Sequence, residues 1–125
     1  MKAIKINTED RKLEMVEINN WTEIAPEIGN GCTTFACPVS FDNGDTIYID
    51  DEGLYNDFGG GFITPDWDYP IVGNAIILGT DSEGESIDAV TTIEELQKQI
   101  FWVSREDCVE WQNQVMIESP KIFFL

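Results

Sequence analysis

The side chains of this chain that can do chemistry are mainly carboxylates. Its 125 residues include 24 Asp and Glu, only 7 Lys and Arg, and no histidine, so the net charge is −17. Without histidine, the Ser-His and Cys-His nucleophile systems are excluded. Two carboxylates can still act as an acid and a base, but among so many acids some pair will always be found. We therefore predict that the protein is not an enzyme.

Clustered carboxylates are also the ligands that Mg²⁺ and Ca²⁺ prefer. Asp50, Asp51 and Glu52 stand together before Gly53, yet their spacing does not match the calcium loop of an EF-hand. The acids between residues 81 and 88 lack the distal glutamate of that loop. Acids at turns and strand ends explain both clusters better, and we predict neither a metal nor a cofactor.

The cysteines and the glycine run are poor matches to known binding motifs. Cys32, Cys37 and Cys108 supply three thiols without the fourth cysteine or histidine of a structural zinc site, so free core cysteines are predicted. Residues 59–61 are three consecutive glycines without the following Lys and Ser or Thr of a phosphate-binding loop. We predict a flexible bend there.

The distribution of charge is more informative than the total. The span from Leu13 to Gln97 contains no Lys or Arg, so its acids have no local counter-charge. One reading is an ordinary solvated surface. The other is an interaction face for a basic protein surface, which requires that the acids gather on one exposed side. A membrane surface and direct nucleic-acid binding are excluded, because both are anionic.

Residues 50–73 are predicted to form a long irregular loop that mixes acids with aromatic side chains. Tyr and Trp are enriched at binding hot spots, and nearby carboxylates would pair with Lys or Arg of a partner. The alternative is that the aromatic residues of this loop, including Tyr69, cap the core. The predicted partner-binding residues are Asp50, Asp51, Glu52, Tyr55, Asp57, Asp66, Trp67 and Asp68.

The strands that must position these residues are short. Residues 1–6 and 11–18 are predicted to pair as one hairpin, and residues 35–41 and 46–50 as another. In the second hairpin Asn43 and Gly44 favour a two-residue type I′ turn, and Pro38 predicts an unpaired edge. The apolar run 74–78 is typical of a central strand, and residues 86–90 predict a short one.

Three helices are predicted between and after the strands. Residues 21–28 have apolar side chains at helical spacing, begin with Asn20 and Glu23 as a capping box, and end at Gly29. A second helix begins at Thr92 and runs through Phe101. A third, short helix begins at Ser104. Trp21, Phe101 and Trp102 lie on these predicted helix faces, so we expect them in the core.

These elements predict an α+β fold, with a small mixed or antiparallel sheet built from hairpins and two or three short helices in a single domain, 1–125. The chain has no apolar run long enough to span a membrane, and its first residues lack the apolar stretch of a secretory signal. We therefore expect a cytoplasmic protein. The apolar residues Ile122, Phe123, Phe124 and Leu125 are predicted to dock on the sheet or to contact a second chain, forming an oligomer.

The segments 1–6, 47–54 and 73–81 together resemble a family of small uncharacterised domains found in bacteriophages and bacterial mobile elements. Some members are encoded near antirestriction proteins. The resemblance covers roughly residues 1–100 and contains no catalytic motif. It implies a setting inside a bacterial host cell and supplies no site residues.

The leading hypothesis is a nucleic-acid mimic. In it, carboxylates stand in for phosphates and block the basic, nucleic-acid-binding surface of a host protein, as an anti-defence protein would. One alternative is a protein that sequesters a small nucleotide-like ligand in a cleft, which would require several Lys or Arg side chains to converge. The other is a structural or assembly protein that forms oligomers.

Overall fold

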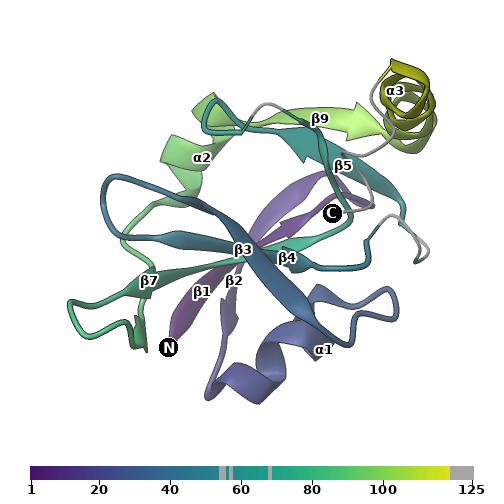
Figure 1. Ribbon diagram of the computed structural model, residues 1–125. Helices are drawn as coiled ribbons and strands as arrows, with labels where there is room; N and C mark the ends of the chain where they lie inside the picture. Colours follow the sequence, from purple (N-terminus) through teal and green to yellow (C-terminus); the bar gives the residue numbers. More distant parts are fainter. Residues whose placement is uncertain (54–55, 57, 68, 119–125) are drawn as a thin grey trace.

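The computed structural model describes residues 1–53, 56, 58–67 and 69–118. Its largest element is an antiparallel sheet with the strand order β2-β1-β7-β4-β3, and a short further strand, β8, pairs with the end of β7 (Figure 1). These strands are β1 (Lys2–Asn7), β2 (Lys12–Glu17), β3 (Phe35–Ser40), β4 (Thr46–Asp50), β7 (Ala75–Thr80) and β8 (Ser86–Ile87). Both predicted hairpins and the predicted central strand are confirmed.

A second, three-stranded antiparallel sheet has the order β6-β5-β9, and four short helical segments accompany the two sheets. The strands are β5 (Gly60–Ile63), β6 (Ile71–Val72) and β9 (Phe101–Ser104). The helical segments are the 3-10 turn η1 (Trp21–Glu23) and the helices α1 (Ile24–Ile28), α2 (Ile93–Gln99) and α3 (Arg105–Glu118). The predicted α+β class is thus confirmed.

The apolar core lies on both faces of the main sheet, which is why β7 has no polar side before Thr80. Successive side chains of a strand point to opposite faces. Ile76 and Leu78 accordingly pack with residues of α1 on one face, whereas Ala75 and Ile77 pack on the other with residues of the small sheet and α2. The molecule therefore has three layers, α1, the main sheet, and the small sheet with α2.

The β3–β4 turn differs from the prediction. The Phe41 amide donates to the Asp45 carbonyl oxygen at 2.8 Å, so the loop between them has three residues. Gly44 has a φ of 93°, while Asn43 is not among the residues with a positive φ. A type I′ turn requires positive φ at two successive residues. Here one glycine supplies the left-handed conformation, and the predicted two-residue turn is wrong.

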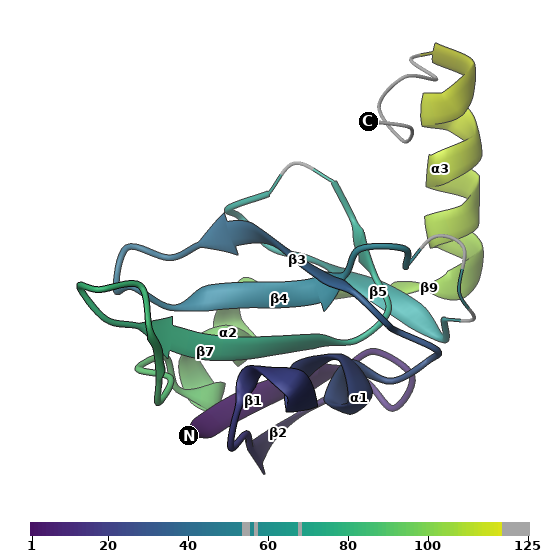
Figure 2. The same cartoon turned by 60° about the horizontal axis from the view of Figure 1, so that its bottom comes forward.

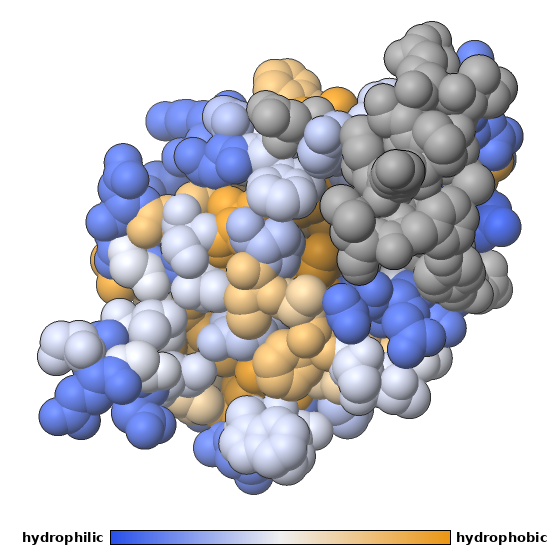
Figure 3. Space-filling view, in the orientation of Figure 1, coloured by the Kyte–Doolittle hydropathy of each residue, from blue (hydrophilic) through white to orange (hydrophobic). Residues whose placement is uncertain are grey.

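The exposed edge of the main sheet is interrupted. β3 is an edge strand, as Pro38 predicted, and its register with β4 shifts between Ala36 and Val39. Figure 3 shows a band of apolar side chains across the middle of the molecule, along the line that β3 follows in Figure 1. A proline and a bulge limit the pairing of this apolar edge with another strand.

The first helical segment begins after Asn20 and ends at Gly29, as predicted. The predicted capping box does not form, because the Glu23 carboxylate accepts from the Asn19 amide at 3.2 Å instead of the Asn20 amide, and the predicted core position of Trp21 is also wrong. The Asn20 side chain accepts a hydrogen bond from the Thr22 amide, and Gly29 ends α1 with a φ of 77°. Trp21, predicted in the core, has 69% of its surface exposed. The interior contacts of this segment come from Ile24 and Ile28 instead.

The second helix is shorter than predicted. It ends at Gln99 because Ile100 is extended, with φ −97° and ψ 148°. Phe101 and Trp102 consequently lie in β9, where successive side chains face opposite ways. Trp102 packs against the core, while Phe101 is 66% exposed. The prediction of a core position is therefore wrong for Phe101.

The three glycines do not form the flexible bend that the sequence predicted. Gly60 and Gly61 belong to β5 and are buried. A Cβ atom on Gly61 would lie 2.5 Å from the Ile71 carbonyl oxygen and 2.8 Å from the Cys108 sulfur. Glycine is therefore needed because strand β6 and helix α3 both approach this backbone closely.

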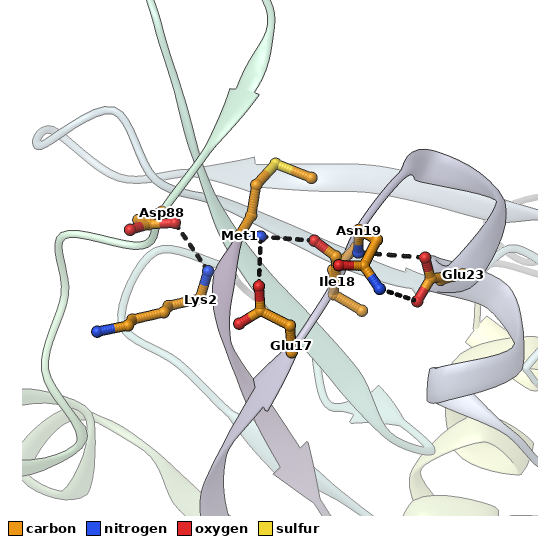
Figure 4. Close-up of polar contacts among 7 residues, drawn as sticks. All are labelled: Met1, Lys2, Glu17, Ile18, Asn19, Glu23 and Asp88. Atoms are coloured by element: carbon orange, nitrogen blue, oxygen red, sulfur yellow. Dashed lines mark hydrogen bonds and ion pairs between the residues drawn. The ribbon is translucent and has the colours of Figure 1, made fainter.

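Polar contacts hold the beginning of the chain against the strands around it (Figure 4). The Met1 amino group donates to the Ile18 carbonyl oxygen at 2.7 Å and pairs with the Glu17 carboxylate at 3.0 Å. The Lys2 amide donates to the Asp88 carboxylate at 2.8 Å. These contacts connect β1 with the end of β2 and with the segment that follows β8.

The cysteines agree with the prediction only in part. Cys32, Cys37 and Cys108 are free, as predicted, but Cys37 is exposed and only Cys108 is buried. Among the described residues, no helix is both long and apolar enough to cross a membrane. The predicted C-terminal contact through residues 122–125 lies outside the described residues.

Candidate functional site

Asp50 is the predicted partner-binding acid that the structure places least favourably. It is only 7% exposed, and its carboxylate accepts hydrogen bonds from the Glu52 amide at 2.9 Å and the Asn56 side-chain amide at 2.7 Å. Both carboxylate oxygens thus hold the turn that follows β4. We correct its predicted role from partner contact to support of this turn.

The other predicted residues that the structure describes lie in two separate loops. Asp51 and Glu52 are exposed in the turn after β4, whereas Asp66 and Trp67 are exposed in the loop between β5 and β6. Tyr55, Asp57 and Asp68 lie outside the described residues.

The exposed acids as a whole are spread over the molecule rather than gathered on one side. The strand registers place the β1–β2 turn and the end of β4 at one end of the main sheet, and the β3–β4 and β7–β8 turns at the other. Figure 2 shows the latter two turns far from α3. The exposed acids are Glu9, Asp10, Glu17, Asp42, Asp51, Glu52, Asp66, Glu83, Glu85, Asp88, Glu94, Glu95, Glu106, Asp107 and Glu110. The expected one-sided acidic face is therefore absent from the described residues.

A local cleft does bring acids together from distant parts of the chain. It has a volume of about 440 Å³ and opens between the β3–β4 turn, the β5–β6 loop and α2. Its acids are Asp42, Asp66 and Glu95, one from each segment. The other lining residues are Phe41, Asn43, Pro65, Thr91 and Gln99. Of the predicted site residues, the cleft thus contains Asp66.

A buried clamp fixes two walls of this cleft. The Asp45 carboxylate accepts hydrogen bonds from the Val90 amide at 3.0 and 3.1 Å and from the Thr91 amide at 2.7 Å. The Asn43 side-chain amide donates to the Thr91 hydroxyl at 2.8 Å, and its oxygen accepts from the Asp45 amide. The β3–β4 turn is thereby tied to the residues that lead into α2.

The helix wall is positioned by its cap and by its buried face. Thr92 caps α2 by accepting a hydrogen bond from the Glu95 amide at 3.2 Å, and its hydroxyl donates to the Glu95 carboxylate. Leu96 is fully buried in the core. Glu95 and Gln99, four residues apart, lie on the same side of the helix and line the cleft.

The third wall is the beginning of the β5–β6 loop. Thr64, at its base, is 1% exposed, and its carbonyl oxygen accepts a hydrogen bond from the Trp67 amide at 3.2 Å. This turn presents Pro65 and Asp66 to the cleft. The Trp67 ring lies edge-on to the Tyr69 ring, with their centroids 6.1 Å apart. The Tyr69 ring in turn contacts the Trp111 ring of α3, with a centroid distance of 5.2 Å.

The lining of the cleft is acidic. No Lys or Arg is among its lining residues, and none of the ion pairs between described residues involves its acids. The described residues contain no group of three or more His, Cys, Asp or Glu side chains arranged to hold a metal ion. The three carboxylates suit an extended organic cation with several hydrogen-bond donors better than a single metal ion.

Sequence reasoning missed most of this site. Asn43 was recognised only as a turn residue, and Thr92 only as the start of a helix. No local pattern links residues 42, 66 and 95, because only the packing of the β3–β4 turn, the β5–β6 loop and α2 brings them to one cleft.

Comparison with known proteins gives no further information. No family model, no curated protein and no solved structure matches the chain. The resemblance to small phage domains therefore stays a prediction.

Proposed function

We propose that this protein binds a positively charged segment of a partner protein, and that the cleft receives a Lys or Arg side chain of that segment. The observation that carries the proposal is the convergence of Asp42, Asp66 and Glu95 on a cleft whose lining contains no cation. In a chain of net charge −17, these acids also lie in a strongly negative overall field.

Arginine fits this lining better than a compact ion does. Its planar guanidinium carries five N–H donors, so it can contact carboxylates on different walls at once. Gln99 adds a neutral oxygen atom that can accept one of the remaining donors. Phe41 and Pro65 supply apolar surface for the methylene stem of the side chain.

A partner that otherwise binds nucleic acid is the class of protein we favour. Such surfaces present Lys and Arg at spacings suited to phosphates, and carboxylates on a folded scaffold can occupy the same positions. The exposed acids lie at both ends of the main sheet and form no one-sided face, so they can give only general attraction, and the specific contact has to come from the cleft. Under this proposal the protein competes with nucleic acid for its partner.

The alternative of a small nucleotide-like ligand receives no support from the cleft. A phosphate would need several converging Lys or Arg side chains, and three of the described cations contact other groups. Lys5 pairs with Glu27 at 3.7 Å and Lys12 with Glu14 at 3.3 Å, while Arg105 donates to the Phe58 carbonyl oxygen at 2.7 Å. None of these residues lines the cleft.

The test compares two variants with the same change of charge. In the cleft variant, Asp42→Asn, Asp66→Asn and Glu95→Gln are combined. In the control variant, Glu9→Gln, Glu83→Gln and Glu106→Gln remove three exposed acids that do not line the cleft and are not among the predicted partner-binding residues. The probe is a short peptide in which arginine alternates with serine, and its affinity is measured by fluorescence anisotropy.

We expect the cleft variant to bind this peptide about tenfold more weakly than the native protein, which corresponds to roughly 0.5 kcal/mol for each carboxylate. The control variant should lose no more than about threefold. Equal losses in the two variants would show that only overall charge matters and would refute the cleft as the site. Affinity that is unchanged between about 0.1 M and about 1 M salt would refute ionic recognition altogether.

The class of partner is tested in the bacterial lysate. The immobilised native protein should capture basic proteins at low salt and release them when DNA is added, while the cleft variant captures less. Captured proteins that DNA does not displace would contradict competition for a nucleic-acid-binding surface.

A further inference from the structure

The most exposed large apolar side chains of the small sheet lie beside the cleft. Ile63 of β5 and Phe101 of β9 are directly opposite each other in the strand register. Directly opposed residues point to the same face, so their side chains are neighbours. Phe101 is 66% exposed and Ile63 is 40% exposed, whereas the next pair along the ladder, Phe62 and Trp102, faces the core.

Only one end of this outer face is covered. The Cys108 sulfur of α3 lies where a side chain on Gly61 would point, so the helix packs over that glycine. Gly61 and Ile63 are two residues apart and share the outer face. The helix thus covers the Gly61 end, while the pair formed by Ile63 and Phe101 remains open to solvent.

The open pair is close along the chain to two residues that line the acidic cleft. Pro65 comes two residues after Ile63, and Gln99 comes two residues before Phe101. Two residues of chain span at most about 7 Å between their Cα atoms. An apolar contact and an ionic contact therefore lie side by side, at a distance that one short segment of a partner can bridge.

We propose that the surface formed by Ile63 and Phe101 is the apolar half of the partner site, and that it takes a large aliphatic or aromatic side chain next to the basic side chain in the cleft. This inference rests on the proposed function. The partner segment would present the two side chains about 7 Å apart, as residues i and i+2 of a strand do. Such a segment is both basic and amphipathic.

Charge decides between this occupant and a second copy of the chain. Each copy carries a net charge of −17, and like charges of that size oppose self-association. The acids at the margin of the surface, Asp66 and Glu95, would repel their counterparts in another copy. A basic partner brings the complementary charge, so the exposed apolar pair and the neighbouring acids favour the same kind of partner.

The experiment uses two peptides of equal charge. In one, arginine and leucine alternate with serine between them, and in the other serine replaces every leucine. We expect the native protein to prefer the leucine peptide about tenfold, and to retain a preference at about 0.5 M salt, because apolar contacts are not screened.

The variant Ile63→Thr with Phe101→Thr should lose this preference, so that its two affinities agree within about twofold. Phe101→Thr alone should lose most of it, and provides a second variant because that side chain is the more exposed of the pair. The matched control is Trp21→Thr, since Trp21 is an aromatic residue with 69% exposure outside the small sheet. It should keep the full preference.

The outcomes separate the two proposals. The apolar variants should leave affinity for the serine peptide unchanged, whereas the cleft variant lowers it, so failure of either proposal is seen independently. A preference that survives in the apolar variants, or is lost equally in the Trp21 variant, overturns the inference. So does a native dimer, seen by sedimentation, that the Phe101 variant abolishes, because a second copy would then cover the surface.

Discussion

The buried carboxylate of Asp45 gives the sharpest test of how the cleft is built. Replacing it with alanine removes the acceptor for two amides, those of Val90 and Thr91, which lie 45 or more residues further along the chain. Asp45 is completely buried. The backbone between β8 and α2 would therefore lose its hydrogen bonds to Asp45 and keep only the contact of the Thr91 hydroxyl with Asn43.

The size of the effect follows from the number and type of these hydrogen bonds. A hydrogen bond to a charged group contributes about 1.5–3 kcal/mol. The lower value applies here because Val90 is largely exposed and water can replace its partner. Two such bonds give a loss of about 3 kcal/mol for Asp45→Ala. Asp45→Asn should lose about 1–2 kcal/mol, because the amide oxygen still accepts while its NH₂ group faces a donor.

The assay is urea unfolding followed by tryptophan fluorescence. With a slope of about 2 kcal/mol per molar, the midpoint for Asp45→Ala should fall by about 1.5 M. Asp42→Ala is the matched control, since Asp42 is an exposed acid of the same turn and should change the free energy of unfolding by less than about 0.5 kcal/mol. If Asp45→Ala and Asp45→Asn both unfold at the native midpoint, the hydrogen bonds of Asp45 do not hold the cleft together.

Three further predictions concern other parts of the chain. Gly61→Ala should lower the free energy of unfolding by about 1–3 kcal/mol in the same assay, because its methyl group would meet a carbonyl oxygen at 2.5 Å, and a native-like midpoint would contradict the close packing. Burial raises the pKa of all three thiols, to about 11 for Cys32 and Cys108, where neighbouring carboxylates raise it further, so these two thiols stay protonated at pH 8. Iodoacetamide should therefore modify Cys37 first, because that cysteine is exposed. The alkylation rates of Cys32 and Cys108, followed by mass spectrometry, should rise about tenfold for each pH unit. Equal rates for the three cysteines at pH 8 would refute this. If the apolar residues 122–125 join chains, a protein lacking residues 119–125 should have a smaller mass in light scattering, and equal masses would argue against that contact.

Much of the fold was predictable from local signals. Residues with two-fold alternation and turn residues between them gave both hairpins, and the apolar run before Gly79 gave the central strand β7. Asn20 and Thr92 marked helix starts correctly, because capping depends on residues that are close in sequence. These predictions succeeded where the deciding interaction is local.

The errors arose where a distant segment decides the structure. β5 contains Gly60 and Gly61, which locally favour a bend, but pairing with β6 and β9 holds them in a strand. Phe101 continues the helical pattern of Leu96 and Ile100, yet it pairs with Ile63 of β5 as a strand residue, and its side chain points outward. Tertiary pairing thus overrides local preference at both positions.

The candidate site was the least predictable part. Asp66 and Trp67 were selected because they lie in a loop rich in acids and aromatic residues, and both are exposed. Asp50 was selected on the same grounds but is buried, because its side chain is needed by the turn that it begins. Composition can indicate an acidic interaction protein, but only the arrangement of the strands shows which acids meet.

The position of β7 has a consequence for how the chain acquires its structure. The hairpins β1–β2 and β3–β4 are each complete within the first 50 residues, yet they share no strand pairing, because β7 lies between β1 and β4. During synthesis both hairpins would be complete early. The edges of β1 and β4 that pair with β7 would stay without hydrogen-bond partners until residues 75–80 are synthesised. We expect assembly to be governed by this late, non-local step, and the waiting hairpins to be the species most in need of chaperone protection.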